Sequence, residues 1–445
     1  MKNRSLSLPI LSIPSALFSI FFGALILVAA TSIACAQEKV LFSFTYAEGE
    51  LPTTGLYMDA KGDLFGTAQK GGPHGQGDVF ELEHEPNGSR TFKIIHAFGS
   101  PMPGTVDGVQ PESGLIADAK GNLYGTTYAG GKHGGGTVFE LSEKNGTWSE
   151  KILYSFGASA TDGIEPKGGL VRDAAGHLYG TAYFGGKYVV GGTVFELIPK
   201  ATGEWTEKIL HNFGLGPDGF EPIGNLARDA KGNLYGTTES SGDNGSGSVF
   251  ELSPAGGSWK ETILYPFGVL PTGPRTPMAG VILDGKGNLY GTSYFGSAST
   301  MYPGRGTVFE LMPTTVAPWN EKILHSFTLA ATDGANPASN LIFDNKGNLY
   351  GTTTNGGPNK GDGTVFEFSP AAGGKWTFKQ LCSFGHNATN GRAPYGGVVR
   401  DAAGNLYGTT FVGGEDNYGT IFEIVHPKAA TAAEGESADA DSLPE

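Results

Sequence analysis

The stretch that decides the fold is Asp118-Ala-Lys-Gly-Asn-Leu-Tyr-Gly-Thr-Thr127, which is followed by Gly136-Thr-Val-Phe-Glu-Leu141 and Lys151-Ile-Leu-Tyr-Ser-Phe-Gly157. This unit occurs seven times, and successive copies lie 55 to 60 residues apart. The central leucines of the seven copies are Leu64, Leu123, Leu178, Leu234, Leu289, Leu349 and Leu406. A repeat of this length predicts a propeller or a solenoid rather than a series of unrelated domains.

Each unit contains four short segments that are rich in β-branched and aromatic residues and are bounded by Gly, Asp and Pro, as is typical of β-strands. The first two segments are joined by a stretch from Asp118 to Gly121, which has the residue preferences of a type I turn. In five units the hairpin between the third and fourth segments carries a tryptophan, and we expect each one to shield the outer corner of its own blade. These tryptophans are Trp148, Trp205, Trp259, Trp319 and Trp376.

The two ends of the repetitive region complement each other. Lys39-Val-Leu-Phe-Ser-Phe44 matches the fourth strand of the other units but precedes the first unit, whereas the seventh unit stops after Gly419-Thr-Ile-Phe-Glu-Ile424. A ring whose N-terminal strand completes the last blade accounts for both facts and leaves no open sheet edge. The sequence therefore predicts an all-β fold, a seven-bladed β-propeller with four-stranded blades, over residues 37–426.

The segments outside the repeat differ from it in composition. Residues 1–36 start with basic residues, continue with an apolar core and end in Ala34-Cys35-Ala36, which predicts a secretory signal peptide. An uncleaved anchor and a lipoprotein acylated at Cys35 are alternatives, of which the lipoprotein is less favoured because Ser32 stands where a lipobox usually has Leu. Residues 427–445 are rich in alanine and acidic residues, which predicts a disordered tail. We therefore expect a secreted, periplasmic or cell-surface protein with no membrane span once the leader is removed.

The charge of the chain argues against several classes of partner. The sequence has 30 Lys and Arg against 44 Asp and Glu, a formal net charge of −14. An acidic chain without a basic stripe does not fit nucleic acid or an anionic membrane as a partner. The two cysteines have no metal-ligand spacing, and no sequence pattern of a metalloprotease, serine hydrolase or phosphate loop occurs. We expect a monomer without a cofactor, with calcium as the exception considered below.

The unit resembles a known repeat family. Gly-Asn-Leu-Tyr-Gly-Thr-Thr, a Gly-Gly loop and Gly-Thr-Val-Phe-Glu-Leu are similar to the GloVer tandem repeat of bacterial exported proteins, and the similarity covers about residues 39–424. The resemblance implies export, in some members with a C-terminal sorting anchor, and it implies no established activity or catalytic residues. This chain departs from the anchored members because its sequence ends in an acidic tail.

Two loops of each unit are expected on one rim of the ring, the usual ligand face of a propeller. The first rim loop joins strand four to the next strand one and reads Asp-Gly-x-x-Pro, and the glycine-rich second rim loop joins strands two and three. A circle of first-loop carboxylates would suit Ca²⁺, which takes oxygen ligands, whereas the alternative is that each aspartate caps its own turn. These aspartates are Asp107, Asp162, Asp218 and Asp333. Tyr128, Tyr183 and Tyr294, at the start of the second rim loops, are expected to contact a ligand.

Residues that break the repeat are favoured ligand contacts, because a single small ligand requires different groups on its different sides. The fifth unit departs most, with Thr272-Gly-Pro-Arg275 in its first rim loop and an extended second rim loop over 297–305. Arg275, Tyr302 and Arg305 add cationic and aromatic groups to an acidic rim, so we expect them to contact an anionic or sugar-like ligand.

The sequence as a whole favours non-enzymatic recognition of a glycan or a protein at or outside the cell surface. A glycoside hydrolase would require a pair of carboxylates that breaks the repeat, and none is evident. An extracellular propeller hydrolase or lyase acting on carbohydrate remains an alternative, as does a purely structural component of the envelope.

Overall fold

The computed structural model of the protein describes residues 38–100, 106–214, 218–240, 245–268, 273–296, 304–328, 330, 332–358 and 361–425. The predicted leader at 1–36, the predicted tail at 427–445 and Tyr302 lie outside the described residues. Two short 3-10 turns occur in the described ranges, η1 (Tyr46–Glu48) and η2 (Ala372–Gly374). Within the same ranges, no helix reaches the length and apolar character that a membrane crossing requires.

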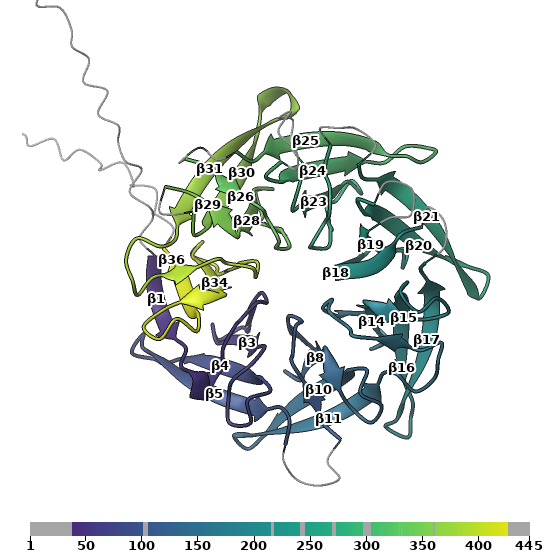
Figure 1. The fold of residues 1–445 in the computed structure, drawn as a ribbon, viewed down its shortest axis with the longest axis horizontal. Helices are drawn as coiled ribbons and strands as arrows, with labels where there is room; N and C mark the ends of the chain where they lie inside the picture. Colours follow the sequence, from purple (N-terminus) through teal and green to yellow (C-terminus); the bar gives the residue numbers. More distant parts are fainter. Residues whose placement is uncertain are drawn as a thin grey trace, which may run out of the picture. The chain divides into compact units, whose positions relative to one another are not determined.

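Seven four-stranded antiparallel sheets, the blades, surround a central axis (Figure 1). Blade 1 consists of β2 (Tyr57–Met58), β3 (Leu64–Ala68), β4 (Asp78–His84) and β5 (Arg90–Ala97). Blade 2 consists of β7 (Ile116–Ala117), β8 (Leu123–Thr127), β10 (Thr137–Lys144) and β11 (Thr147–Ser155). Blade 3 consists of β13 (Val171–Arg172), β14 (Leu178–Ala182), β16 (Thr193–Pro199) and β17 (Trp205–Asn212). Blade 4 consists of β18 (Phe220–Arg228), β19 (Leu234–Ser240), β20 (Ser248–Ala255) and β21 (Ser258–Pro266).

The remaining blades complete the ring and confirm the predicted closure. Blade 5 consists of β22 (Ile282–Leu283), β23 (Leu289–Ser293), β24 (Thr307–Met312) and β25 (Asn320–Ser326). Blade 6 consists of β27 (Ile342–Phe343), β28 (Leu349–Thr353), β30 (Thr364–Ala371) and β31 (Lys375–Ser383). Blade 7 consists of β33 (Val399–Arg400), β34 (Leu406–Thr410), β36 (Thr420–Ile424) and β1 (Glu38–Ser43). The N-terminal β1 pairs antiparallel with the C-terminal β36, with Lys39 opposite Glu423, and Figure 1 shows the two ends of the colour scale side by side there.

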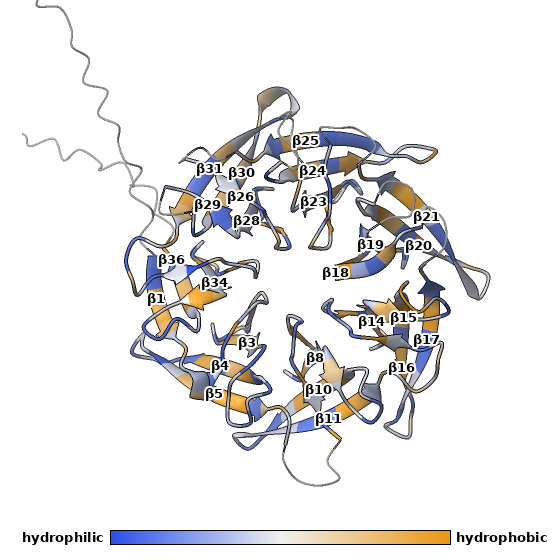
Figure 2. Ribbon diagram, viewed as in Figure 1, coloured by the Kyte–Doolittle hydropathy of each residue, from blue (hydrophilic) through white to orange (hydrophobic). Residues whose placement is uncertain are grey.

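The turn and strand residues of the repeat explain how each blade forms. Asp118 accepts hydrogen bonds on Oδ1 from the backbone N–H groups of Lys120 (2.8 Å) and Asn122 (3.0 Å), so it caps the predicted turn. In the buried strand β8, a Cβ on Gly125 would lie 2.6 Å from the ring of Phe139 in β10, so the strand requires glycine at that position. Along the strands, apolar and polar stretches alternate (Figure 2).

Neighbouring blades are held together by one repeated aromatic contact. The phenylalanine after strand four is fully buried and meets the strand-three phenylalanine of the next blade edge to face, as Phe98 meets Phe139 at a centroid distance of 5.2 Å. The ring-closing contact between Phe44 and Phe80 has nearly the same geometry, at 5.3 Å. Because each such ring buries a large apolar area, this contact makes a major contribution to blade association.

The tryptophans require a correction, because they face the preceding blade. Trp148 of blade 2 lies 6.0 Å from Phe65 of blade 1, and Trp376 of blade 6 lies 5.9 Å from Tyr290 of blade 5. The packing is therefore between blades rather than at the outer corner of one blade. The reason is that the hairpin between strands three and four places the indole ring next to the apolar surface of the preceding blade.

The two rim loops of each unit pair with one another, which confirms that they share a rim. The pairs form two-stranded sheets in four blades and isolated bridges or an extension of β18 in the others. The two-stranded sheets are β6 (Gly108–Val109) with β9 (Ala129–Gly130), β12 (Gly163–Ile164) with β15 (Phe184–Gly185), β26 (Gly334–Ala335) with β29 (Asn355–Gly356), and β32 (Gly391–Arg392) with β35 (Val412–Gly413).

The residue before the proline of each first rim loop has a left-handed backbone and links two blades. Gln110, for example, donates its N–H to the carbonyl of Gln76 in the preceding blade (2.8 Å) and accepts from the N–H of Tyr128 (2.9 Å). Such a φ in a non-glycine residue costs roughly 1–3 kcal/mol, which these backbone hydrogen bonds offset. The seven residues, with φ between 53° and 62°, are Leu51, Gln110, Glu165, Glu221, Thr276, Asn336 and Ala393.

Candidate functional site

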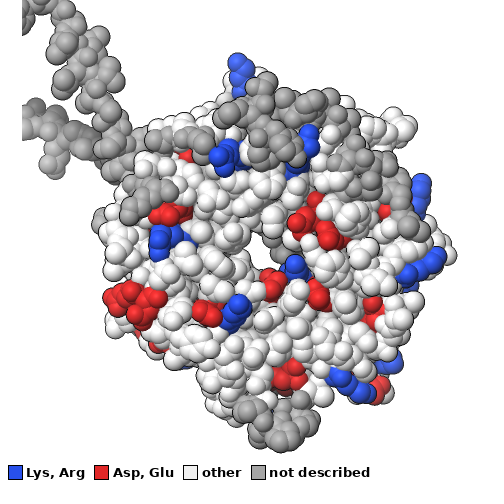
Figure 3. Space-filling view, in the orientation of Figure 1, with Lys and Arg blue, Asp and Glu red and all other residues white. Residues whose placement is uncertain are grey.

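A pocket of about 400 Å³ lies at the centre of the ring and takes lining residues from all seven blades. Figure 3 shows the corresponding opening, with acidic and basic side chains next to each other at its edge. In each blade, the residue immediately after the proline of the first rim loop lines this pocket. We call these seven residues the channel ring: Thr53, Glu112, Lys167, Ile223, Met278, Ala338 and Tyr395.

At the channel ring no residue type repeats among the seven units. The proline before it is present in all seven units, yet the seven ring residues are all different. The buried phenylalanines, by comparison, keep the same residue in every blade. A ligand without sevenfold symmetry, in contrast, requires different groups on different sides, and the channel ring provides them.

One side of the ring combines a cation, two aromatic faces and carboxylates. The Nζ atom of Lys167 lies 3.7 Å from the ring centroid of Tyr183 and 5.5 Å from that of Tyr128, which is cation–π geometry. The hydroxyl of Tyr183 donates to Oε2 of Glu239 at 2.7 Å. Burial, together with a hydrogen bond to Glu165, raises the pKa of Tyr128 to about 12, so this hydroxyl stays protonated.

The next position along the ring is a half-buried carboxylate. Burial raises the pKa of Glu112, while the nearby charge of Lys167 and a hydrogen bond from the side chain of Gln69 lower it, and burial is the larger effect. Further round the ring, Tyr395 lies 5.3 Å from Phe411 edge to face and is hydrogen-bonded to Tyr294. The polar members Thr53, Glu112 and Lys167 thus lie side by side in three successive blades, and the other four blades contribute the apolar and aromatic members.

The ligand contacts predicted from the sequence fall into two groups. Tyr128, Tyr183 and Tyr294 each contact a member of the channel ring. Arg275 lies beyond the pocket lining, where its backbone pairs with Phe295, and Arg305 is exposed, with its carbonyl accepting from Asn336. Tyr302 lies outside the described residues. Binding through any of them stays a prediction.

Sequence reasoning missed the channel ring itself, Glu112, Lys167 and Tyr395 included. The signal was available, because an alignment of the seven first rim loops on their proline shows that the following residue never repeats. What the sequence could not show is that this residue faces the axis, which depends on where the chain enters strand one.

The four aspartates predicted as a metal ring lie at four separate junctions between blades. Each contacts the strand-four residue of the preceding blade: His325 Nε2 lies 2.9 Å from Asp333, and the Tyr154 hydroxyl donates to Asp162 at 3.1 Å. Asp107 and Asp218 face His96 and His211 in the same way, at 3.6 and 3.5 Å. The structure therefore brings none of the four together, and calcium binding by these aspartates stays a prediction.

Three junctions contain a second acidic residue that sequence reasoning missed. These residues are Glu150, Glu207 and Glu261, which occupy the same position of strand four and point back to the preceding junction. Burial raises the pKa of Glu150 to about 7 and that of Glu261 to about 8. Burial would also raise the pKa of Asp107, but His96 and the N–H of Ser100 hold it below its usual value.

Comparisons with known proteins agree with the repeat and the fold. A family model described as a Gloeobacter/Verrucomicrobia repeat matches residues 85–281 and 262–434. No curated protein matches the sequence. Among solved structures, an ancestral GH74 enzyme is 11% identical with a TM-score of 0.52, and the match covers 84% of this chain but 47% of that chain. A putative 6-phosphogluconolactonase from Bacteroides uniformis is 15% identical with a TM-score of 0.46, over 74% of this chain and 87% of that chain. At these identities the likeness concerns the fold alone.

Proposed function

This chain belongs to the Gloeobacter/Verrucomicrobia repeat family, and we propose that it is an exported binding module that recognises a glycan at its channel ring. The observation that carries the proposal is that no residue type repeats among the seven ring residues, which all line one pocket. The Asp and Gly of the turns between strands one and two and the buried phenylalanines, in contrast, are the same in all seven units. Selection for a common fold does not account for seven different side chains around one pocket.

The chemistry of the ring suits a carbohydrate. Sugars present C–H faces that pack on aromatic rings and hydroxyls that exchange hydrogen bonds with polar groups. Tyr395 provides an aromatic surface, Lys167 provides N–H donors and Glu112 provides an acceptor. A pocket of about 400 Å³ with a few convergent polar groups is within the usual size of small-ligand sites. A protein ligand that inserts a loop into the channel is the alternative partner.

Binding without catalysis is the better account of the acidic groups. Hydrolysis of a glycoside uses two carboxylates at a fixed separation. Among the described residues that line the pocket, Glu112 is the only carboxylate. Its raised pKa is the one property that an acid catalyst would share, so glycoside hydrolysis is the second function to test.

The proposal includes the site of action. The sequence of residues 1–36 has the features of a secretory leader, so we place the protein outside the cytoplasm, secreted, periplasmic or at the cell surface. We also propose that it acts as a monomer and binds no nucleic acid, which fits its net charge of −14. A purely structural role in the envelope would not explain why the seven channel-ring residues differ.

A glycan array followed by calorimetry tests the proposal. Lys167→Ala and Tyr395→Ala are expected to weaken binding of the selected glycan by at least about tenfold, or about 1.4 kcal/mol. Lys231→Ala is the matched control, because Lys231 is an exposed lysine in the turn between strands one and two of blade 4 and is expected to change affinity less than about twofold. Equal affinities for all three variants, or no glycan bound by the wild type, would contradict glycan recognition at the channel ring. Release of reducing sugar that is lost in Glu112→Gln would show hydrolysis instead.

A further inference from the structure

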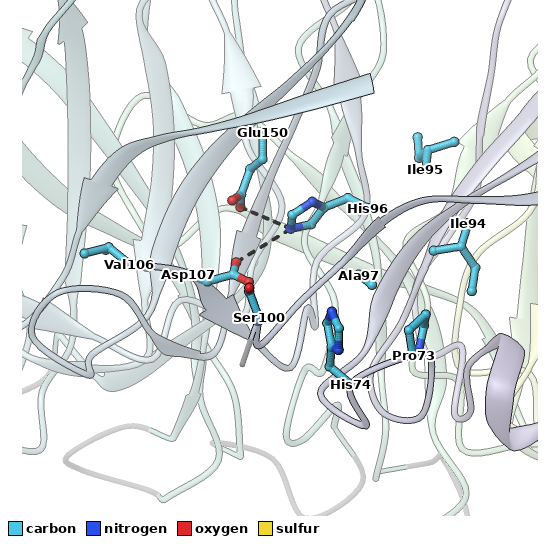
Figure 4. Close-up of a pocket in the computed structure, with 10 residues that line it drawn as sticks. All are labelled: Pro73, His74, Ile94, Ile95, His96, Ala97, Ser100, Val106, Asp107 and Glu150. Atoms are coloured by element: carbon cyan, nitrogen blue, oxygen red, sulfur yellow. Dashed lines mark hydrogen bonds and ion pairs between the residues drawn. The ribbon is translucent and has the colours of Figure 1, made fainter. Parts of the chain in front are cut away.

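The outer sides of two blade junctions carry a recurring group of one histidine and two carboxylates, far from the chemistry of the channel ring. At the first, His96 extends from β5 of blade 1, Asp107 from the following rim loop, and Glu150 from β11 of blade 2. Figure 4 shows the three side chains pointing toward one another from these three segments. The second group, His211, Asp218 and Glu261, repeats the arrangement between blades 3 and 4.

The distances within each group are those expected around a small metal ion. His96 Nε2 lies 3.6 Å from Asp107 Oδ1 and 3.6 Å from Glu150 Oε1. In the second group His211 Nε2 lies 3.5 Å from Asp218 and 3.6 Å from Glu261, and in both groups the three ligand atoms lie within 4.8 Å of one another. Tetrahedral ligands with bonds of about 2.0–2.2 Å are separated by about 3.3–3.6 Å.

The facing atoms are buried and have no hydrogen-bond partner. His96 Nε2, Asp107 Oδ1 and Glu150 Oε1 are all inaccessible to solvent and have no hydrogen-bond partner. The Asp107 side chain as a whole is only 9% exposed. In the second group His211 Nε2 is also unsatisfied, as are Asp218 Oδ1 and Glu261 Oε1, the carboxylate oxygens other than the two nearest the histidine. Buried polar atoms in native proteins nearly always have partners, so unsatisfied atoms that converge on one point indicate a missing ligand.

Other junctions of the same ring serve as internal comparisons. Where tyrosine replaces histidine, the Tyr154 hydroxyl lies 3.1 Å from Asp162 and 2.9 Å from Glu207 and fills the centre of the group. Where the second carboxylate is Phe378, that ring stacks on His325 at 4.4 Å, and His325 bonds Asp333 directly. Among the described residues, the ligand set of a metal site occurs only in the two groups that contain a histidine and both carboxylates.

We propose that His96, Asp107 and Glu150 bind one divalent transition-metal ion and that His211, Asp218 and Glu261 bind a second. One imidazole nitrogen and two carboxylate oxygens are ligands of Zn²⁺ and similar ions, whereas Ca²⁺ takes oxygen ligands throughout. Water supplies the remaining coordination position. His74 lines the same pocket as His96, Asp107 and Glu150 (Figure 4). Each ion joins two neighbouring blades, because its ligands come from both.

Metal stoichiometry tests this proposal with Zn²⁺ and Co²⁺ as the probes. The purified full ring, stripped with a chelator and then dialysed against Zn²⁺, is expected to hold two ions per chain. His96→Tyr, which gives the first group the composition of the natural Tyr154 junction, is expected to hold one, and His96→Tyr with His211→Tyr none. His325→Gln, which changes the same strand position where the second carboxylate is absent, is expected to keep both ions. The absorption of bound Co²⁺ should be halved and then abolished in the same series.

Folding of each variant is checked by circular dichroism and thermal unfolding in the presence of chelator. Glu150→Gln is a second test of the first site, because it keeps the size of the side chain and removes one ligand charge. It is expected to weaken the first Zn²⁺ site at least about tenfold. The proposal is overturned if the wild type binds neither Zn²⁺ nor Co²⁺, or if folded His96→Tyr and Glu150→Gln proteins bind as much metal as the wild type.

Discussion

The junction between blades 7 and 1 and the junction between blades 1 and 2 occupy equivalent places in the repeat but contain opposite chemistry. In the first, Phe42 of β1 stacks on Phe92 of β5, with centroids 4.0 Å apart and planes 3° apart. In the second, the equivalent positions are His96 and Glu150, and Asp107 lies beside them. Both junctions keep the buried phenylalanine contact of the common frame.

The difference separates what holds the blades together from what varies among them. Because an apolar stack occupies this position where the ring closes, blade association there does not depend on charge. Buried charges are rarely the more stable choice, because desolvation offsets their mutual attraction. The polar junctions therefore carry a role beyond stability, which is the reason to expect a bound ion there.

The largest expected effect comes from the frame that both junctions share. Phe98→Ala and Phe44→Ala each remove a fully buried ring and should each lower the free energy of unfolding by about 3–5 kcal/mol. Urea denaturation of the two variants measures this directly. A loss below about 1 kcal/mol at either junction would show that the phenylalanine frame does not hold the blades.

A third junction, between blades 6 and 7, isolates the cost of a buried carboxylate without a histidine. Glu38 accepts from the side chain of Asn390 (2.7 Å) and the N–H of Gly391 (3.1 Å), yet burial outweighs these bonds and raises its pKa from 4.5 to about 7. Because the folded protein holds this proton more tightly than the unfolded chain, stability from this group is complete below about pH 4.5. It is lost as the pH rises to about 7, by up to about 3 kcal/mol.

Glu38→Gln should remove this pH dependence, so the difference in unfolding free energy between variant and wild type should grow in favour of the variant from pH 4.5 to 7. Glu415→Gln, at an exposed glutamate, is the control and should follow the wild type at every pH. Parallel pH profiles for wild type and Glu38→Gln would show that the Glu38 carboxylate is not buried at the junction between blades 6 and 7.

The smallest effect is expected when one junction is converted into the other. His96→Phe combined with Glu150→Phe gives the junction between blades 1 and 2 the pair found between blades 7 and 1, and Asp107→Asn is added so that no unpaired buried charge remains. In the presence of chelator the triple variant should change the unfolding free energy by less than about 1 kcal/mol, because an apolar stack replaces costly buried polar groups. With Zn²⁺ present, only the wild type should gain stability at this junction. A loss of several kcal/mol in chelator would mean that the polar group itself holds the blades.

The fold was predictable because each rule of the repeat is local. The Asp118 turn, the alternation of strand residues and the spare segment Lys39–Phe44 all appear in the sequence. The pairing of β1 with β36 follows because the seventh unit lacks a fourth strand of its own. The direction of Trp148 was not predictable, since it depends on which surface lies across the junction. Blade 4 also differs in detail, because β18 runs without a break from its rim loop into strand one.

The candidate sites were less predictable, for a geometric reason. The sequence distinguishes Lys167 and Glu112 as residues that break the repeat, but their facing the axis depends on the three-dimensional path of strand one. Asp107 was recognised from its loop, whereas Glu150 lies 43 positions further along and meets it only because strand four of blade 2 packs against blade 1. Contacts across a junction follow from the stacking of blades rather than from any pattern within one unit.

Anomalous diffraction at the zinc edge, from crystals grown with Zn²⁺, tests the central claim most directly. The account predicts two peaks per chain, one between His96, Asp107 and Glu150 and one between His211, Asp218 and Glu261, and no peak beside Tyr154. Absence of both peaks, or a peak of equal height at the Tyr154 junction, would contradict it.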